Sequence, residues 1–133
     1  MAKIAIEIKN FDKLTKLAEK YPAVARKFID RAIVNSIGSI QRETLPITPI
    51  KNARLIADLR VPHFAPFQGR LGSSVPYARR VHDLYSAGTP YKNPSLNKRA
   101  LAGFLQVGVL RSKKTIDDVF VGALKDIVNE IAK

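Results

Sequence analysis

The sequence predicts an α+β fold, in which a small mixed or antiparallel sheet packs against a long helix in the N-terminal half and a C-terminal helix, with long loops. Residues 3–9 alternate between apolar and polar side chains, as in a half-buried strand. Residues 22–45 and 115–131 instead carry apolar side chains three and four apart, as amphipathic helices do. With 133 residues, the chain fits a single domain spanning residues 1–133.

The N-terminal third is predicted to form one strand and two helices. The strand at residues 3–9 has one face made of Ile4, Ile6 and Ile8. Asn10 can cap a short helix that ends near Tyr21. Pro22 suits the first turn of the next helix, and Pro46 ends that helix, because the residue before a proline is pushed out of the helical region.

Gly38 lies inside this second helix, where glycine costs about 1 kcal/mol relative to alanine. It therefore indicates either a close contact at that point or a tolerated weakness. Between residues 46 and 75 the helical period is lost, and four prolines interrupt the chain. We expect strands at residues 54–61 and 69–75, with residues 62–66 as their connection.

The next segment is predicted to alternate short elements and loops. Residues 77–84 fit one or two helical turns after Pro76, and residues 85–95 have the composition of a loop. Ser95 can cap a short helix through Ala102. Residues 103–110 are a strand candidate, which the basic turn at residues 111–114 ends.

The last helix is predicted to begin at Thr115. Asp118 stands at capping-box spacing from Thr115, and acidic side chains suit the positive N-terminus of a helix. Its apolar stripe consists of Phe120, Ala123, Leu124, Ile127, Val128 and Ile131. The predicted core of the whole domain includes Phe28, Ile29, Ile33, Ile37, Phe120, Leu124 and Ile127.

Positive charge is concentrated in the middle of the chain. The net charge is +12, and residues 42–114 contain thirteen Lys or Arg against three acids, which accounts for +10 of it. The candidates for facing DNA or a protein partner are Arg54, Arg60, Arg70, Arg79, Arg80, Lys98 and Arg99. The nearby tyrosines that could stack on bases or anchor an interface are Tyr77, Tyr85 and Tyr91.

Three interpretations of this basic segment stay open. It could bind nucleic acid, because phosphate contacts release counterions. It could dock on an acidic protein surface instead. It could also do both, by contacting nucleic acid and a protein neighbour at once.

An enzyme is not expected, because the sequence offers no convergent catalytic groups, and residues 69–74 lack the lysine and spacing of a phosphate-binding loop. No cofactor is predicted. The absence of cysteine and the wide separation of His63 and His82 argue against a structural metal. No apolar run is long enough to cross a bilayer, so we expect a soluble protein made in the cytosol, without a membrane partner.

Several short signals follow one another along the chain in a recognisable order. A long helix is followed by Pro49 to Asp58, then by Tyr77-Ala78-Arg79-Arg80-Val81-His82, and then by Val119-Phe120-Val121-Gly122-Ala123-Leu124. This order resembles the neck and tail-completion (tail-component) protein family of long-tailed bacteriophages. That family reads Pro-x-x-Thr-Gly-x-Leu-x-x-Ser, then Tyr-Ala-x-x-Val-His or Tyr-Ala-x-x-Val-Glu at a helix start, then Phe-Leu-x-x-Ala-Leu. The match at this helix start implies that His82 packs beside a short helix. Here Asn52-Ala53 replaces Thr-Gly, and Asp58 replaces the serine; residues 65–74 offer an alternative register.

The resemblance implies a structural virion protein that forms a ring of six or twelve copies in the neck, or completes the tail, at the head-to-tail junction. Its partners would be further copies of itself and other phage neck, head-completion and tail proteins, with packaged DNA as an additional contact. It would be made in the host cytoplasm and then reside in the virion. Loops 46–66 and 85–95 would become ordered on docking. The alternative is a small basic nucleic-acid-binding protein.

Overall fold

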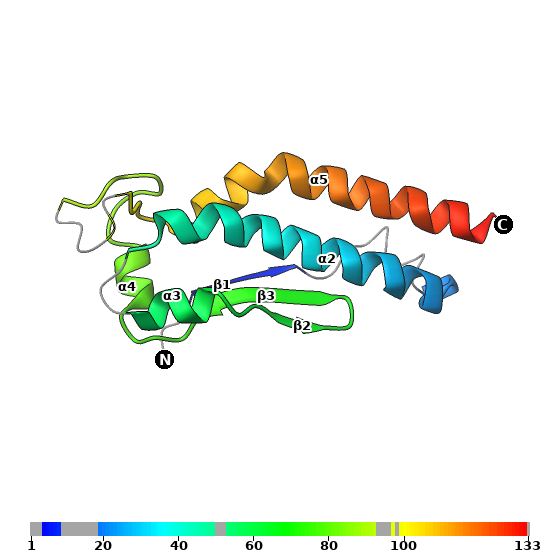
Figure 1. Cartoon of the computed structure of the whole chain (residues 1–133), viewed down its shortest axis with the longest axis horizontal. Coiled ribbons are helices and arrows are strands. Elements are labelled where there is room, and N and C mark those ends of the chain that lie inside the picture. The colour runs from blue at the N-terminus through cyan, green and yellow to red at the C-terminus, as the bar shows by residue number, and fades with distance from the viewer. Residues whose placement is uncertain (1–3, 9–18, 50–52, 93–96, 98, 133) are drawn as a thin grey trace.

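Three layers make up the structure, a computed structural model that describes residues 4–8, 19–49, 53–92, 97 and 99–132. The first layer is an antiparallel sheet with the strand order β1 (Ile4–Ile8), β3 (Gln68–Ser73), β2 (His63–Ala65). Helix α2 (Pro22–Thr44) lies between this sheet and helix α5 (Phe104–Ile131), which forms the outer layer (Figure 1). This arrangement confirms the predicted α+β class.

Shorter elements gather at one end of the molecule. A 3₁₀ turn, Leu45–Ile47, follows α2, and helices α3 (Ala53–Leu59) and α4 (Ala78–His82) lie beside the same end of the sheet (Figure 1). Helix α4 confirms the prediction of one or two helical turns after Pro76. The helix predicted between Asn10 and Tyr21 lies largely outside the described residues.

Helix α2 approaches the sheet closely at one glycine. Pro22 is in its first turn, as predicted. A Cβ on Gly69 of β3 would lie 2.5 Å from Ile33 Cγ2 and 3.0 Å from Ile37 Cγ1, so a side chain at this position would push the helix away. Gly38, by contrast, has no atom of the described residues within 4 Å of the position that a Cβ would take. Of the two explanations for Gly38, the structure excludes the close contact.

Small and hydroxylated side chains line the contact between α2 and α5. Gly108 of α5 lies directly against Thr44 of α2, and a Cβ on this glycine would overlap the threonine hydroxyl. The buried hydroxyls of Ser36, Thr44 and Ser112 have no hydrogen-bond partner among the described residues. The two helices therefore pack backbone against backbone here, without larger apolar side chains between them.

The second strand is part of a tight hairpin, so the prediction that residues 62–66 only connect two strands is wrong. Ala65 pairs with Gln68, which leaves Pro66 and Phe67 as a two-residue turn. Phe67 adopts a φ of 57°, a region that favours glycine or asparagine. Asp30 Oδ1 of α2 accepts a hydrogen bond from the Phe67 N–H at 2.8 Å, which holds the turn against the helix.

Residues 54–61 do not form the predicted strand, because their buried side chains follow a helical period. Leu55, Ile56 and Leu59 are buried in α3. Asp58 points to β3, where its Oδ2 accepts a hydrogen bond from Ser73 Oγ at 2.6 Å. The segment from residue 46 to 66 is thus mostly regular structure in its described part, and not a long loop.

The C-terminal helix is longer than predicted. Residues 104–110 and the basic residues 111–114 belong to α5, so the predicted strand and turn there are wrong. Thr115 and Asp118 consequently lie inside the helix and do not cap it. Gly103, with a φ of 62°, is the N-cap residue of α5. Residues 99–102 are not helical, which contradicts the short helix predicted to run through Ala102.

The core contains most of the predicted side chains. Ile29, Ile33, Ile37 and Ile127 are buried, while Phe28 and Phe120 are partly buried and pack against the core from its edge. Leu124 is 39% exposed, so its assignment to the core is wrong. The helix turns this side chain toward the flank of α5, away from α2.

Candidate interaction surfaces

The predicted basic candidates collect at the end of the molecule formed by α3, α4 and the segment before α5 (Figure 1). Five of them are exposed there: Arg54, Arg60, Arg79, Arg80 and Arg99. Arg70 lies in β3, on the face of the sheet that points away from α2, and is partly buried. Lys98 lies outside the described residues. We call the group of five exposed arginines the basic end.

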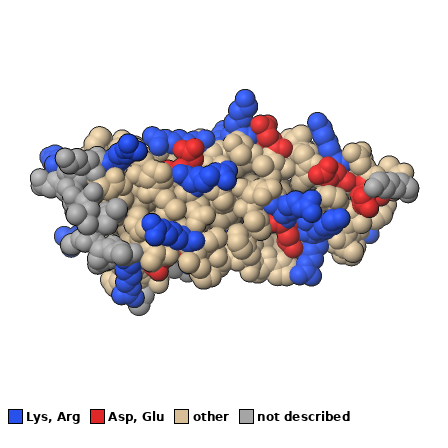
Figure 2. Space-filling view, viewed as in Figure 1, with Lys and Arg blue, Asp and Glu red and all other residues tan. Residues whose placement is uncertain are grey.

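Positive charge is not gathered into one continuous stripe on the face that Figure 2 shows. Lys and Arg side chains lie along the whole length of this face, with uncharged surface between them and Asp or Glu beside several. A protein that tracks a nucleic-acid backbone usually presents a connected basic groove. The charge on this face therefore does not support nucleic-acid binding along the length of the molecule.

The three tyrosines proposed as anchors are all partly buried. Tyr77 packs against the core, and the rings of Tyr85 and Tyr91 lie 5.9 Å apart. The hydroxyl of Tyr91 donates a hydrogen bond to the carbonyl oxygen of Val81 at 2.6 Å. Burial, followed by the charges of Asp83 and Tyr85, raises the pKa of Tyr91 to about 12. Tyr91 thus uses its polar atom within the chain.

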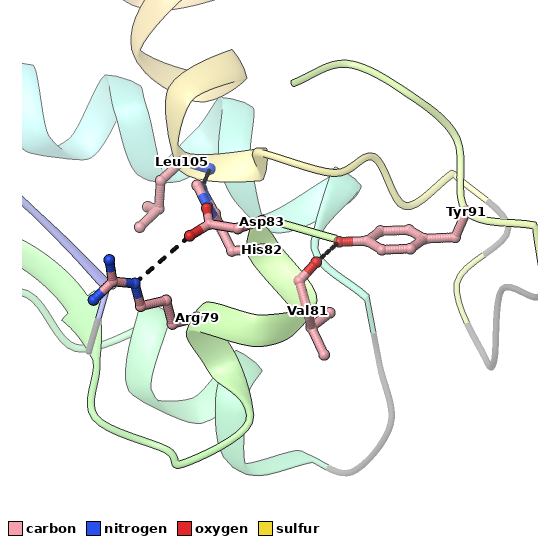
Figure 3. A network of polar contacts seen from close by, with 6 residues as sticks. All are labelled: Arg79, Val81, His82, Asp83, Tyr91 and Leu105. Atoms are coloured by element: carbon pink, nitrogen blue, oxygen red, sulfur yellow. Dashed lines mark hydrogen bonds and ion pairs between the residues drawn. The ribbon is translucent and has the colours of Figure 1, made fainter. Parts of the chain in front are cut away.

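A polar network joins α4 to the start of α5 (Figure 3). His82 Nε2 accepts a hydrogen bond from the backbone N–H of Leu105 at 3.3 Å. Because Nε2 accepts, Nδ1 carries the proton and donates to Asp83 Oδ1 at 2.7 Å. Asp83 Oδ2 also lies 3.7 Å from Arg79 Nε. The imidazole of His82 packs edge-on against the Phe104 ring, with 4.7 Å between the ring centroids.

His82 is the last residue of the short helix α4 and packs against the first turn of α5. The first N–H groups of a helix have no partner within the helix, and His82 satisfies one of them in α5. The His82 carbonyl oxygen accepts a second bond, from the Gly103 N–H at 2.7 Å. Both ring nitrogens are therefore engaged within the chain, which leaves the imidazole little scope for acid–base chemistry.

Backbone hydrogen bonds fix the loop that follows α4. The Gly88 N–H donates to Ala102 O and the Ala102 N–H donates to Thr89 O, each at 2.9 Å. On the other side, the Asn97 side-chain amide donates to the carbonyl oxygens of Pro46 at 2.9 Å and Thr48 at 2.8 Å. The described part of this loop is thereby hydrogen-bonded to the segment just before α5 and to the segment just after α2.

Sequence reasoning missed a row of exposed apolar side chains on α5. Leu110, Val121, Leu124 and Val128 are 69%, 53%, 39% and 51% exposed. Leu124 and Val128 were assigned to the buried stripe, because a helical period alone does not separate two neighbouring faces of one helix. The sequence signal that could have found them is a second set of residues, spaced three and four apart, on the face of the helix next to the buried set.

Comparison with protein-family models, with curated proteins and with solved structures finds no match. Within the described ranges, no helix is long and apolar enough to cross a membrane. The same residues contain no group of three or more His, Cys, Asp or Glu side chains placed to hold a metal ion.

Proposed function

We propose that this chain is a non-enzymatic structural subunit of a tailed bacteriophage, which forms a ring in the neck or completes the tail at the head-to-tail junction. The order of its sequence signals supports this function. The observation that carries the proposal is the basic end, where five exposed arginines stand on short, internally bonded elements.

The basic end is suited to docking against an acidic neighbour. Gln41 Nε2 donates to Leu59 O at 3.1 Å, which ties the end of α3 to α2, and the His82 network ties α4 to α5. Of the nearby acids, Asp58 bonds to Ser73 and Asp83 lies beside Arg79. The exposed arginines therefore stand on elements that are bonded to the two long helices. Such charge speeds encounter and selects partners of opposite sign.

In this proposal the acidic neighbours are other neck, head-completion and tail proteins of the phage, and packaged DNA is a further contact. Copies would assemble head to tail, because repeated heterologous contacts close into rings when the rotation between neighbours fits. Six or twelve copies would match the symmetry of tails and portals. The chain would reside in the virion after assembly in the host cytoplasm.

The proposal is tested by labelling purified phage particles with an antibody to this chain and locating the label by electron microscopy. Label confined to the head-to-tail junction is the expected result. Particles without label, in a lysate that contains the protein, would overturn it. Incorporation of Arg79→Ala with Arg80→Ala should fall, whereas the matched double variant Lys20→Ala with Lys27→Ala, at the start of α2, should enter particles normally.

The second candidate is a small nucleic-acid-binding protein, which the same basic end favours. Affinity for duplex DNA would then fall steeply with salt, by a slope of about 0.9 per phosphate contact on logarithmic axes. Arg79→Ala with Arg80→Ala should weaken binding and flatten that slope, while the Lys20 and Lys27 control should not. No DNA binding at low salt would remove this candidate and leave the protein-docking function.

A further inference from the structure

One side of α5 carries a second apolar row that faces away from α2. Leu110, Val121, Leu124 and Val128 belong to it, with the exposed charged residues Lys114 and Asp117 in the same row. Successive members are four, three, four, three and four residues apart, which is the spacing of a helix–helix seam. We call this row the α5 stripe.

The α5 stripe is costly to leave in water. Burying a valine or leucine side chain is favourable, because it removes apolar surface from water. Helix α5 is the outer layer of the fold (Figure 1), and Val121, Leu124 and Val128 remain 39–53% exposed within about two turns of the helix. Apolar patches of this kind on soluble proteins usually mark an interaction site.

We propose that the C-terminal part of the α5 stripe, from Asp117 to Val128, binds the same part of a second copy of this chain, with the two α5 helices antiparallel about a two-fold axis between Val121 and Leu124. Each Val121 then packs against Leu124 of the second copy, and this layer occurs twice. Val128 of each copy lies next to Asp117 of the other, near the ammonium group of Lys125.

Charge favours this direction of pairing. Parallel helices in register would set Lys114 against Lys114 and Asp117 against Asp117, and like charges at such positions repel. Antiparallel helices instead bring Asp118 of one copy to Lys125 of the other, at the edge of the seam and in both symmetry-related places. Asp118 and Lys125 are both exposed in the single chain, so they can make these contacts.

The shape of the molecule permits the same pairing. The C-terminal half of α5 runs to the end of the molecule opposite α3 and α4 (Figure 1), so two such halves can overlap without bringing the basic ends together. A two-fold contact uses the same surface on both copies and closes with the pair. The pair would therefore form from free chains, whether or not the chain has the proposed phage function. It would also leave the other surfaces of each copy available for a ring.

Analytical ultracentrifugation of the full chain provides the first test. The wild-type chain should sediment as a dimer that dissociates on dilution, and Leu124→Glu should be monomeric at the same concentrations. The matched control is Leu84→Glu, which places the same charge on a leucine that is 54% exposed beyond α4. This control should remain dimeric, and both variants should keep the helical circular dichroism of the wild type.

Charge exchange tests the direction of the helices. Lys125→Asp should raise the dimer dissociation constant about tenfold, which corresponds to about 1.4 kcal/mol. Adding Asp118→Lys to the same chain restores opposite charges in the antiparallel pair, and it should return the constant to near the wild-type value. A double variant that stays as weak as Lys125→Asp would overturn the antiparallel arrangement.

Cysteine cross-linking adds a geometric test, since the natural chain has no cysteine. A mixture of Val121→Cys and Leu124→Cys chains should form the mixed disulfide. Val128→Cys should not cross-link to itself, because antiparallel pairing offsets the two copies of this residue by about 16 Å along the axis. Efficient self-linking at residue 128 would overturn the inference. A wild-type chain that is monomeric at every concentration would also overturn it. The partner of the stripe would then be the chain's own residues 10–18 or another protein.

Discussion

Gly108 of α5 and Thr44 of α2 lie in direct contact, so closely that the glycine hydrogen occupies the place where any side chain would meet the threonine hydroxyl. Thr44 is fully buried, and Ile40 O of α2 is the next neighbour of a Cβ at Gly108, at 3.2 Å. The distance between the two long helices is therefore set by the absence of a side chain at one position.

Replacing this glycine tests that relationship. Gly108→Ala should lower the free energy of unfolding by about 1–3 kcal/mol through overpacking, despite a helix-propensity gain of about 1 kcal/mol. Gly122→Ala in the same helix is the control, because no atom lies within 4 Å of its Cβ position; it should raise stability by up to about 1 kcal/mol. Urea unfolding of both variants measures the difference, and equal effects of the two substitutions would contradict it.

The His82 network should matter for the start of α5. His82→Ala removes the acceptor for the buried Leu105 N–H and the edge-on contact with Phe104, which should cost about 1–3 kcal/mol of unfolding free energy. Hydrogen exchange of the Leu105 amide should become faster. His63→Ala, at an exposed position in β2, should change stability by no more than about 0.5 kcal/mol.

Tyr91 predicts a loss of stability at alkaline pH. Burial raises its pKa to about 12, whereas a tyrosine in the unfolded chain has a pKa of about 10. The folded state then keeps a proton that the unfolded state releases, so this stabilisation is complete below pH 10 and declines as the pH rises toward 12. Between these values the unfolding free energy of the wild type should fall more steeply than that of Tyr91→Phe. Parallel curves would show that the hydroxyl is not held as described.

The hairpin turn depends on a contact from α2. Asp30→Ala should remove the acceptor of the Phe67 N–H and cost about 1.5–3 kcal/mol, the range for a hydrogen bond to a charged group. Asp30→Asn keeps an oxygen at the same place and should lose less. Thermal unfolding of the three proteins compares them, and two variants of equal stability would mean that the hydrogen bond does not hold the turn.

The sequence correctly predicted the elements in which apolar side chains recur at the spacing of a helix or a strand. Helix α2 and strand β1 have long enough apolar patterns, and Pro22 and Pro46 lie close to the two ends of the helix. The start of α5 was mistaken for a strand because Val107, Val109 and Leu110 favour that interpretation locally. Its actual burial pattern depends on Gly108 and Ser112, small residues that hydropathy does not register as core.

The other misassignments have similar causes. In α3, Leu55, Ile56 and Leu59 make too short a stripe to separate a helix from a strand without the packing against β3. The β2–β3 hairpin was hidden because Phe67 occupies a turn position where glycine or asparagine is the usual signal. The basic end followed from charge counting along the chain, whereas the α5 stripe required knowing which flank of the helix α2 leaves uncovered.

The strand order implies that β1 joins the sheet late in folding. Ile4 of β1 pairs with Ser73 of β3, so the strand must find a partner 69 residues further along the chain, after α2, α3 and β2. At a synthesis rate of about 5–20 residues per second, β1 leaves the ribosome several seconds before that partner exists. Contacts of such long sequence separation also form slowly. The β2–β3 hairpin and α2 can assemble first, and β1 closes the sheet from its open edge as a late step.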